Sequence, residues 1–176
     1  MIVAGSGNSA GQAAMFLSDG AAKVLLVIRS DDITKKMSAY LSRRVQAQPN
    51  IEILYRTEIR KMSGDQKLGE VELENTRTGE RRIVKTPAIL SMIGARPCTE
   101  WLPPEIERDE KRFIKTGSDV VDAPAWRASK RQPAPLETSL PGIFAAGDVR
   151  SGSVKRCAAA VGAGGMAVAG IHMSLA

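Results

Sequence analysis

The sequence predicts an α/β fold with a parallel β-sheet at its centre, and three observations point to it. Short aliphatic runs alternate with helical patterns over residues 1–55, which is typical of successive βα units. Aromatic residues make up only 4% of the chain, so the core must be aliphatic, as in parallel sheets covered by helices. From residue 57 to 85, polar and apolar residues alternate between turn signals, which indicates an antiparallel β-meander inserted into the βαβ domain.

The first half of the chain contains three strands that alternate with two helices. Residues 1–4 are apolar and end at a glycine cluster, and residues 9–18 carry apolar positions at helical spacing, which predicts a strand, a tight turn and a helix. The continuous aliphatic run 24–28 is typical of a strand that is buried on both faces of a sheet. A helix over 34–48 and a third strand over 51–55 are expected next, on either side of a Pro-Asn pair.

The meander is predicted from its turns. Antiparallel strands are expected over 57–61, 69–75 and 81–85, because the segments SGDQK and TRTGE between them are turn signals. The apolar run 88–93 is of the buried type again and ends at a glycine, so it is expected to return to the parallel sheet.

Two domains are expected, over residues 1–93 and 94–176. In the second, residues 99–140 are rich in Pro, Lys, Arg and Asp and are expected to be irregular and surface-lying, with at most one short hairpin. A brief strand over 141–148 and an Ala- and Gly-rich helix over 154–174 complete the prediction.

The charge balance favours anionic partners. The chain has 25 Lys and Arg residues against 19 Asp and Glu residues, a net charge of +6. The basic residues are scattered, and no aromatic residues are interleaved with them. Nucleic-acid binding is therefore not expected.

The cysteines and the apolar segments predict a reduced, cytoplasmic setting. Cys98 and Cys157 form neither a CxxC pair nor a metal-ligand spacing. No signal peptide is recognisable, and no apolar run approaches the roughly 18 residues that span a bilayer, so no membrane association is expected. Cys157, in an Ala-rich helix, is expected to be a small buried side chain rather than a redox group. His172, the one histidine, is expected at the surface near the end of the last helix.

A glycine motif follows the first strand. Residues 5–10 (GSGNSA) match the pattern G-x-G-x-x-A directly before a helix, which is the context of a dinucleotide fingerprint. In such a turn Gly5 permits the tight bend, Gly7 lets a pyrophosphate approach the backbone, and Ala10 keeps the helix close to the strand. The sequence therefore predicts a dinucleotide site, with an ordinary βα turn as the alternative.

The end of the second strand indicates which dinucleotide is bound. NAD-binding proteins usually carry Asp or Glu there to accept hydrogen bonds from the ribose hydroxyls, whereas this chain has Arg29. A guanidinium cannot accept these hydrogen bonds but can pair with a 2′-phosphate. NADP(H) is therefore favoured over NAD, with Lys35 and Lys36 as further candidate phosphate contacts. A solvated arginine is the alternative.

A second constellation lies near the C-terminus. Asp148 follows the small-residue run GIFAAG and could offer its carboxylate to sugar-like hydroxyls. The helix that contains Arg156, Cys157 and Ala158 begins nearby and would offer backbone N–H groups to an electronegative ring edge. From the residues alone, a plain strand-to-helix turn is an equal alternative.

Together these segments resemble the pyridine-nucleotide-dependent flavoprotein disulfide reductases, most closely the low-molecular-weight thioredoxin reductases. The segment GSGNSAGQAAMF (5–16) is similar to the family's NADPH fingerprint, IGARP (93–97) to its return crossover, and GIFAAGD (142–148) to its second FAD motif. The resemblance covers nearly the whole chain. It implies a Rossmann-like NAD(P)-binding domain followed by the C-terminal part of an FAD-binding domain.

The resemblance also implies roles for individual residues. It places Asp148 at the ribityl chain of FAD, and Arg156, Cys157 and Ala158 beside the isoalloxazine ring. No catalytic residue or metal ligand is assigned. The residues expected to bind NADP(H) or FAD are Gly5, Gly7, Asn8, Ser9, Ala10, Arg29, Gly94, Gly147, Asp148, Arg156, Cys157 and Ala158.

The sequence departs from the family in three respects. Of the basic cluster that follows the second NADPH strand in the family, only Arg29 is present, and Thr34 stands near the position of the later arginine. The chain contains neither the family's opening GxGxxG segment for the ADP half of FAD nor the CxxC found in typical members. It thus looks like the C-terminal portion of a longer reductase or a truncated gene product. We expect it to bind FAD poorly and to be inactive alone.

Three functions remain open from the sequence. The leading hypothesis is an oxidoreductase in which NADPH reduces FAD and electrons pass to a disulfide, to a thioredoxin-like partner or to another acceptor. The resemblance implies a homodimer at full length. The second hypothesis is a non-catalytic NADP(H)-binding or regulatory module. The third, an NADP-dependent dehydrogenase without flavin, lacks a recognisable general acid, because neither Tyr40 nor Tyr55 has a partner pattern.

Overall fold

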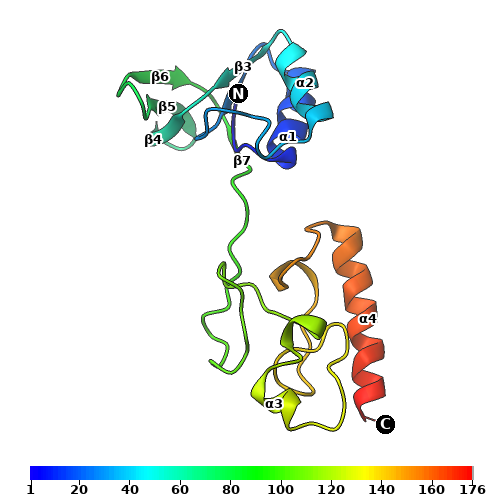
Figure 1. The fold of residues 1–176 in the computed structure, drawn as a ribbon. Helices are drawn as coiled ribbons and strands as arrows, with labels where there is room; N and C mark the ends of the chain where they lie inside the picture. Colours follow the sequence, from blue (N-terminus) through cyan, green and yellow to red (C-terminus); the bar gives the residue numbers. More distant parts are fainter. Residues whose placement is uncertain (176) are drawn as a thin grey trace. The chain divides into compact units, whose positions relative to one another are not determined.

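The computed structural model describes residues 1–175. The chain folds into two compact units, Met1–Gly94 and Ala95–Ala176, which Figure 1 shows in blue to green and in green to red. Each unit has its own buried core. The predicted α/β fold is confirmed.

The first unit is built on a four-stranded parallel sheet. Its strand order is β3-β2-β1-β7, and every neighbouring pair is parallel. Strands β2 and β3 extend the sheet on one side of β1, and β7 extends it on the other side. The strand order therefore reverses at β1, next to the glycine motif. The strands are β1 (Ile2–Ala4), β2 (Val24–Val27), β3 (Ile51–Leu54) and β7 (Ile89–Ser91).

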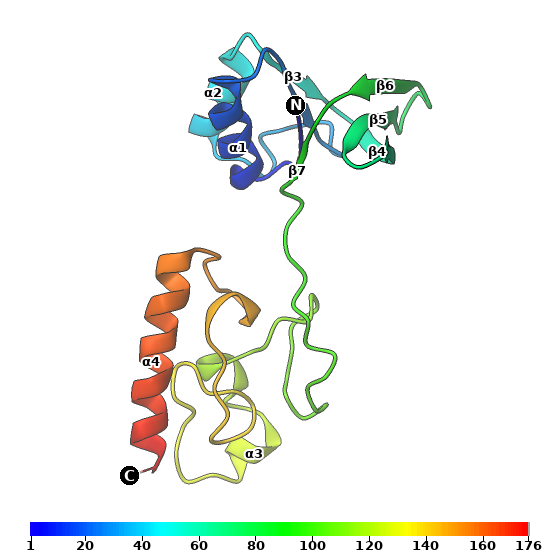
Figure 2. The same ribbon diagram turned by 180° about the vertical axis from the view of Figure 1, so that it is seen from behind.

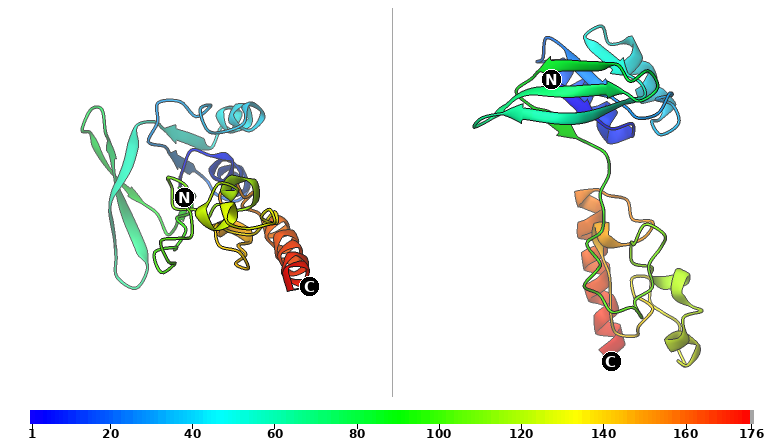
Figure 3. Two further views of the ribbon diagram at one scale, coloured as in Figure 1. Left: turned by 60° about the horizontal axis from the view of Figure 1, so that its bottom comes forward. Right: turned by 90° about the vertical axis from the view of Figure 1, so that its left-hand side faces the viewer.

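Different elements cover the two faces of this sheet. The helices α1 (Asn8–Ser18) and α2 (Ala39–Ala47) pack on one face. The antiparallel meander packs on the other face, as the right-hand view of Figure 3 shows. Its strands are β4 (Thr57–Gly64), β5 (Leu68–Asn75) and β6 (Arg81–Lys85).

Alternation along the central strands explains why they are apolar without interruption. Successive side chains of a strand point to opposite faces. Val24 and Leu26 belong to the core under the helices, whereas Leu25 and Val27 pack against Val71 of the meander. Both faces are covered, so no position of β2 can be polar, and all four residues are buried.

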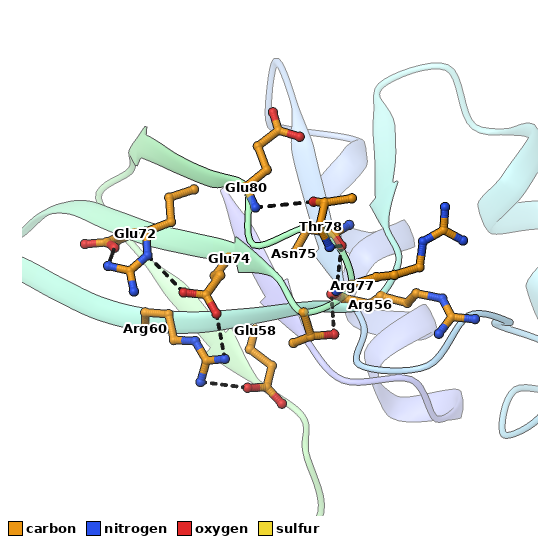
Figure 4. Close-up of polar contacts among 11 residues, drawn as sticks. Arg56, Glu58, Arg60, Glu72, Glu74, Asn75, Arg77, Thr78 and Glu80 are labelled. Carbon is orange, nitrogen blue, oxygen red and sulfur yellow. Dashed lines mark hydrogen bonds and ion pairs between the residues drawn. The ribbon is translucent and has the colours of Figure 1, made fainter.

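The outer face of the meander carries a chain of ion pairs (Figure 4). Glu74 accepts hydrogen bonds from Arg60 and Arg81, both at 2.9 Å. Arg60 also pairs with Glu58, and Arg81 with Glu72. These contacts link neighbouring strands across the sheet, and the hydrogen bond from Arg60 lowers the pKa of Glu74.

The second unit is mostly irregular. It contains a short helix α3 (Pro124–Arg127), two 3-10 turns (Gly117–Val120 and Gly147–Val149) and the long helix α4 (Cys157–Leu175). The helix α4, orange to red in Figure 2, runs beside the loops of this unit. Gly170 is its buried residue and faces the ring of Phe144.

The predicted helix over 34–48 is wrong at its start. The helix α2 begins at Ala39, because Asp32 caps a turn instead: its carboxylate accepts hydrogen bonds from the backbone and hydroxyl of Thr34 at 2.7 Å each. Ile33 and Met37 are buried in the core. Residues 31–38 therefore form a loop with a single turn, in which the backbone N–H of Met37 donates to the Ile33 oxygen at 3.3 Å, rather than the first part of α2.

Two expectations for the second unit are also wrong. Residues 141–148 form no strand: Phe144 makes one isolated bridge with Glu137, and Gly147 begins a 3-10 turn. Residues 99–140 are irregular but not merely surface-lying, because Ile106 and Trp126 are almost fully buried in small cores. Scattered apolar residues without periodicity gave no sign of these cores.

The helix α4 corrects two further expectations. It has 19 residues and is apolar enough to cross a membrane by length and composition, whereas no apolar run of this length was expected. Length and composition alone are weak evidence of a membrane span, and of the described residues of α4 only Gly170 is buried. Cys157, expected to be buried, is exposed at the first turn of α4.

Candidate functional site

A cavity of about 670 Å³ opens in the first unit at the carboxyl ends of its parallel strands. In open α/β sheets, ligands bind at this edge, at the point where the strand order reverses. Its floor is the turn between β1 and α1. The lining residues are Ala4, Gly5, Ser6, Gly7, Asn8, Ser9, Val27, Arg29, Lys36, Thr57, Glu58, Ile59, Ser91, Met92, Ile93 and Gly94.

The two turn glycines differ in what surrounds them. Gly5 has φ +142°, and a Cβ there would lie 2.4 Å from the backbone oxygen of Met92. Only glycine fits this close approach of β7 to the turn. At Gly7 a Cβ would meet only the backbone oxygen of Lys36, 4.0 Å away, so the space beside Gly7 is open to a ligand. This arrangement fits a pyrophosphate against the backbone.

The first residues of α1 divide into ligand-facing and structural positions. Asn8 and Ser9 line the cavity, and the side-chain oxygen of Asn8 accepts a hydrogen bond of 2.8 Å from the backbone N–H of Ser38. Ala10 is fully buried and belongs to the core under the helices. Ala10 is not among the residues that line the cavity, so its predicted role, to keep helix and strand close, affects a ligand only indirectly.

Basic side chains dominate the charge at the cavity. Arg29 and Lys36 line it, and within residues 1–175 neither forms an ion pair. Lys35, in contrast, pairs with Asp31 at 2.7 Å, and this hydrogen bond raises the pKa of Lys35 and lowers that of Asp31. The second oxygen of Asp31 pairs with Arg56. Because both oxygens are paired in this way, Asp31 does not compete with a bound phosphate for Arg29 and Lys36.

The return of the chain to the sheet completes the cavity. Gly94 lines it with φ +101°, and a Cβ there would meet nothing within 4 Å. Thr57, Glu58 and Met92 also line the cavity, although they are not among the residues predicted from the sequence. No local pattern marks them, because the start of β4 and the residue after β7 reach this edge only in the folded chain.

The other predicted site residues lie in the second unit. Gly147 has φ +77°, and a Cβ there would lie 3.6 Å from the Cβ of Ala160 in α4, so the acidic turn packs on the start of this helix. Asp148, Arg156, Cys157 and Ala158 are all exposed. An exposed carboxylate beside a helix start fits a polar ligand that has sugar-like hydroxyls and an electronegative edge.

Comparison with known proteins places these motifs in a family. Residues 1–164 match the family described as pyridine nucleotide-disulphide oxidoreductase. The thioredoxin reductase of Yarrowia lipolytica is 32% identical over 168 residues, which are 95% of this chain and 47% of that protein. That of Streptomyces coelicolor is 33% identical over 92% of this chain and 45% of its own length.

Solved structures give the same result. The crystal structure of Lactococcus lactis thioredoxin reductase in its FR conformation has a TM-score of 0.74 at 25% identity, covering 98% of this chain and 52% of that one. The crystal structure of T. acidophilum thioredoxin reductase has a TM-score of 0.71 at 25% identity, and the match covers 98% of this chain and 51% of that one. The chain spans about half the length of the relatives it matches. On its sequence and its fold, the chain belongs to the pyridine nucleotide-disulphide oxidoreductase family.

Proposed function

We propose that this chain supplies the NADPH-binding half of a thioredoxin reductase-like flavoprotein oxidoreductase. The observation that carries the proposal is the cavity over Gly7, which is open at the backbone and has Arg29 at its edge. Family membership supports an oxidoreductase, and the named relatives are thioredoxin reductases. The nucleotide, the flavin and the acceptor are the proposed parts.

Residues of the first unit would hold NADPH in stated roles. The backbone from Gly5 to Ser9 would receive the pyrophosphate, because a helix N-terminus presents free N–H groups to an anion. The guanidinium of Arg29 would pair with the 2′-phosphate. Gly94 would let the adenine or nicotinamide side of the nucleotide pass close to the chain, since it has no side chain in the cavity.

Residues of the second unit would hold FAD. The exposed carboxylate of Asp148 would accept hydrogen bonds from ribityl hydroxyls, and the first turn of α4, with Arg156, Cys157 and Ala158, would face the flavin ring. When bound, FAD supplies an acceptor for the hydride of NADPH. The residues of this chain orient the two cofactors, and the further acceptor is proposed to be a disulfide, as in a thioredoxin-like partner.

A non-catalytic NADP(H)-binding module is the second candidate. The observation that favours it is the exposure of Asp148 and of the residues 156–158, because an exposed contact holds a large ligand weakly. An absorbance spectrum of the purified chain with FAD, before and after desalting, tests the flavin site. A retained flavin band supports the oxidoreductase and contradicts the expectation that this chain alone binds FAD poorly, whereas its loss together with NADPH binding shows that the chain by itself is a nucleotide-binding unit without flavin.

The test of the nucleotide site is a charge reversal at Arg29. In Arg29→Glu the affinity for NADPH should fall about tenfold to a hundredfold, because a charge-assisted hydrogen bond is lost and a carboxylate repels the phosphate. The affinity for NADH should change by less than about threefold. Fluorescence titration of the nicotinamide measures both.

Arg43→Glu is the matched control for this test. Arg43 is exposed on α2 and does not line the cavity, yet its reversal changes the net charge of the chain by the same amount. If both reversals weaken NADPH equally, or if Arg29→Glu weakens NADH as much as NADPH, the assignment of Arg29 is wrong.

A further inference from the structure

We propose that Lys36, and not its neighbour Lys35, is the second cation that selects the 2′-phosphate of NADPH. This inference rests on the proposed NADPH site. The sequence leaves the two lysines equivalent, since they are adjacent in one basic pair. The structure separates them by what each side chain contacts and by where its backbone lies.

The side chain of Lys35 already forms an ion pair. Its ammonium donates to Asp31 Oδ1 at 2.7 Å, and the other oxygen of this carboxylate accepts from Arg56 at the same distance. A phosphate would have to displace an existing carboxylate from Lys35. Lys35 is not among the residues that line the cavity, whereas Lys36 is.

The backbone of Lys36 is held beside the phosphate-binding turn. Its carbonyl oxygen is the atom nearest to a Cβ built on Gly7, at 4.0 Å. On either side the loop is anchored: Ile33 and Met37 are buried at 0% and 3% exposure, and Ser38 donates its backbone N–H to Asn8.

Met37 also fixes the loop against α1. Its sulfur would lie 2.7 Å from a Cβ built on Gly11, so this glycine permits the close packing of loop on helix. The freedom of Lys36 is thereby reduced to its side-chain rotamers. A cation fixed in this way loses less entropy on binding an anion than one on a mobile loop.

The charges of the cavity leave Lys36 available to an anion. Glu58 is the carboxylate among the lining residues, and Arg60 pairs with it at 3.0 Å. Arg29 and Lys36 are thus two cationic residues among those that line the cavity, and neither has an ion-pair partner within residues 1–175. An ammonium only donates hydrogen bonds, so Lys36 cannot accept from ribose hydroxyls but can donate to phosphate oxygens. The pair Arg29 and Lys36 therefore fits a phosphorylated ribose.

The experiment compares neighbouring lysines in the 176-residue chain. Lys36→Met keeps the length of the side chain and removes its charge, and Lys35→Met is the matched control. Affinities for NADPH and NADH, and for 2′,5′-ADP and ADP, are measured by calorimetric or fluorescence titration. Lys36→Met should weaken NADPH and 2′,5′-ADP about five- to tenfold and NADH and ADP less than twofold, as for a partly exposed phosphate contact.

Two results complete the expected pattern. Lys35→Met should leave the ratio of NADPH to NADH affinity within about twofold of the unsubstituted chain, because its ion pair lies outside the cavity. Lys36→Arg should restore most of the preference, since a guanidinium also donates to phosphate. A general loss of positive charge would instead affect both lysines alike.

The contrary outcomes distinguish this inference from the proposed function. If the unsubstituted chain prefers NADPH and Lys36→Met keeps that preference, or if Lys35→Met loses it equally, the role of Lys36 is overturned and the NADPH site stands. If the unsubstituted chain binds neither NADPH nor NADH, both the site and the inference are overturned.

Discussion

Arg131 and Glu137 form a two-point ion pair in the second unit, with both N–O distances at 2.7 Å. The carboxylate of Glu137 is fully buried, and the backbone N–H groups of Ala134 and Gly142 also donate to it. The guanidinium lies 4.8 Å from the ring centre of Trp126. This cluster joins residues 126–142, which have little regular secondary structure of their own.

The pair predicts a loss of stability in acid. Burial by itself raises the pKa of Glu137, but the hydrogen bonds from Arg131, Gly142 and Ala134 outweigh it and lower the pKa from 4.5 to about 2. A carboxyl whose pKa is lowered by folding stabilises the folded state at pH values above the pKa that it has in the unfolded chain. The second unit should therefore lose up to about 3 kcal/mol as the pH falls from about 4.5 to 2.

The variant Glu137→Gln should remove this acid-dependent contribution. It should lower the free energy of unfolding at pH 7 by about 2–3 kcal/mol, because a charged partner of Arg131 is lost. Tryptophan emission measures it, since both tryptophans, Trp101 and Trp126, lie in the second unit. The exposed Glu110→Gln is the control and should change little. An unaltered pH dependence in Glu137→Gln would contradict the role of the pair.

The turn glycines should respond differently to alanine. Gly5→Ala combines a left-handed φ with a Cβ 2.4 Å from the Met92 oxygen and should destabilise the first unit by at least about 2 kcal/mol. Gly7→Ala has room and an ordinary φ of −89°. It should cost less than about 1 kcal/mol, as expected at a helix N-cap, yet weaken NADPH about tenfold by blocking the pyrophosphate.

Thermal unfolding followed by circular dichroism, together with NADPH titration, checks this pair. A Gly7→Ala chain that binds NADPH as well as the unsubstituted chain would show that the pyrophosphate does not approach this backbone. Equal unfolding midpoints for Gly5→Ala and the unsubstituted chain would contradict the close approach of β7 to the turn.

Two glycines of α4 should give effects of opposite sign. A Cβ at Gly170 would lie 2.8 Å from the ring of Phe144, whereas nothing lies within 4 Å of a Cβ at Gly165. Gly170→Ala should destabilise the second unit by about 1–2 kcal/mol, because the ring must move. Gly165→Ala should stabilise it by about 0.5–1 kcal/mol, since alanine is the better helix former. Denaturant unfolding followed by tryptophan emission measures both, and two changes of the same sign would contradict the packing of α4 on Phe144.

The ion pairs on the outer face of the meander should stabilise the first unit to an extent that depends on the salt concentration. Glu74 is shared between Arg60 and Arg81, so Glu74→Gln should lower the unfolding midpoint of the first unit slightly at low salt. The difference should shrink at about 1 M salt, where charges are screened beyond about 3 Å. Glu70→Gln on the same strand, for which no ion pair occurs within residues 1–175, is the control. A difference that stays constant with salt would contradict the ion-pair explanation.

The order of strands and helices in the first unit could be read from the sequence because its cause is local. Aliphatic runs such as 24–27 are apolar at every position since both sheet faces are covered, and the meander strands alternate since one of their faces meets solvent. The glycine motif could be read as well, because Gly5 must adopt a conformation that other residues avoid. The start of α2 could not, because the buried side chains of Ile33 and Met37 fix a loop where the sequence favours a helix.

The sequence by itself determined the α/β class, the glycine turn and the arginine at the end of β2, since each depends on side chains that are close along the chain. The tertiary structure alone decided that Thr57, Glu58 and Met92 join the cavity and that Trp126 and Glu137 are buried. It also decided that Lys36 lies at the cavity while Lys35 is paired with Asp31. The physical reason is that these contacts join residues that only the path of the folded chain brings together, and no spacing in the sequence encodes that path.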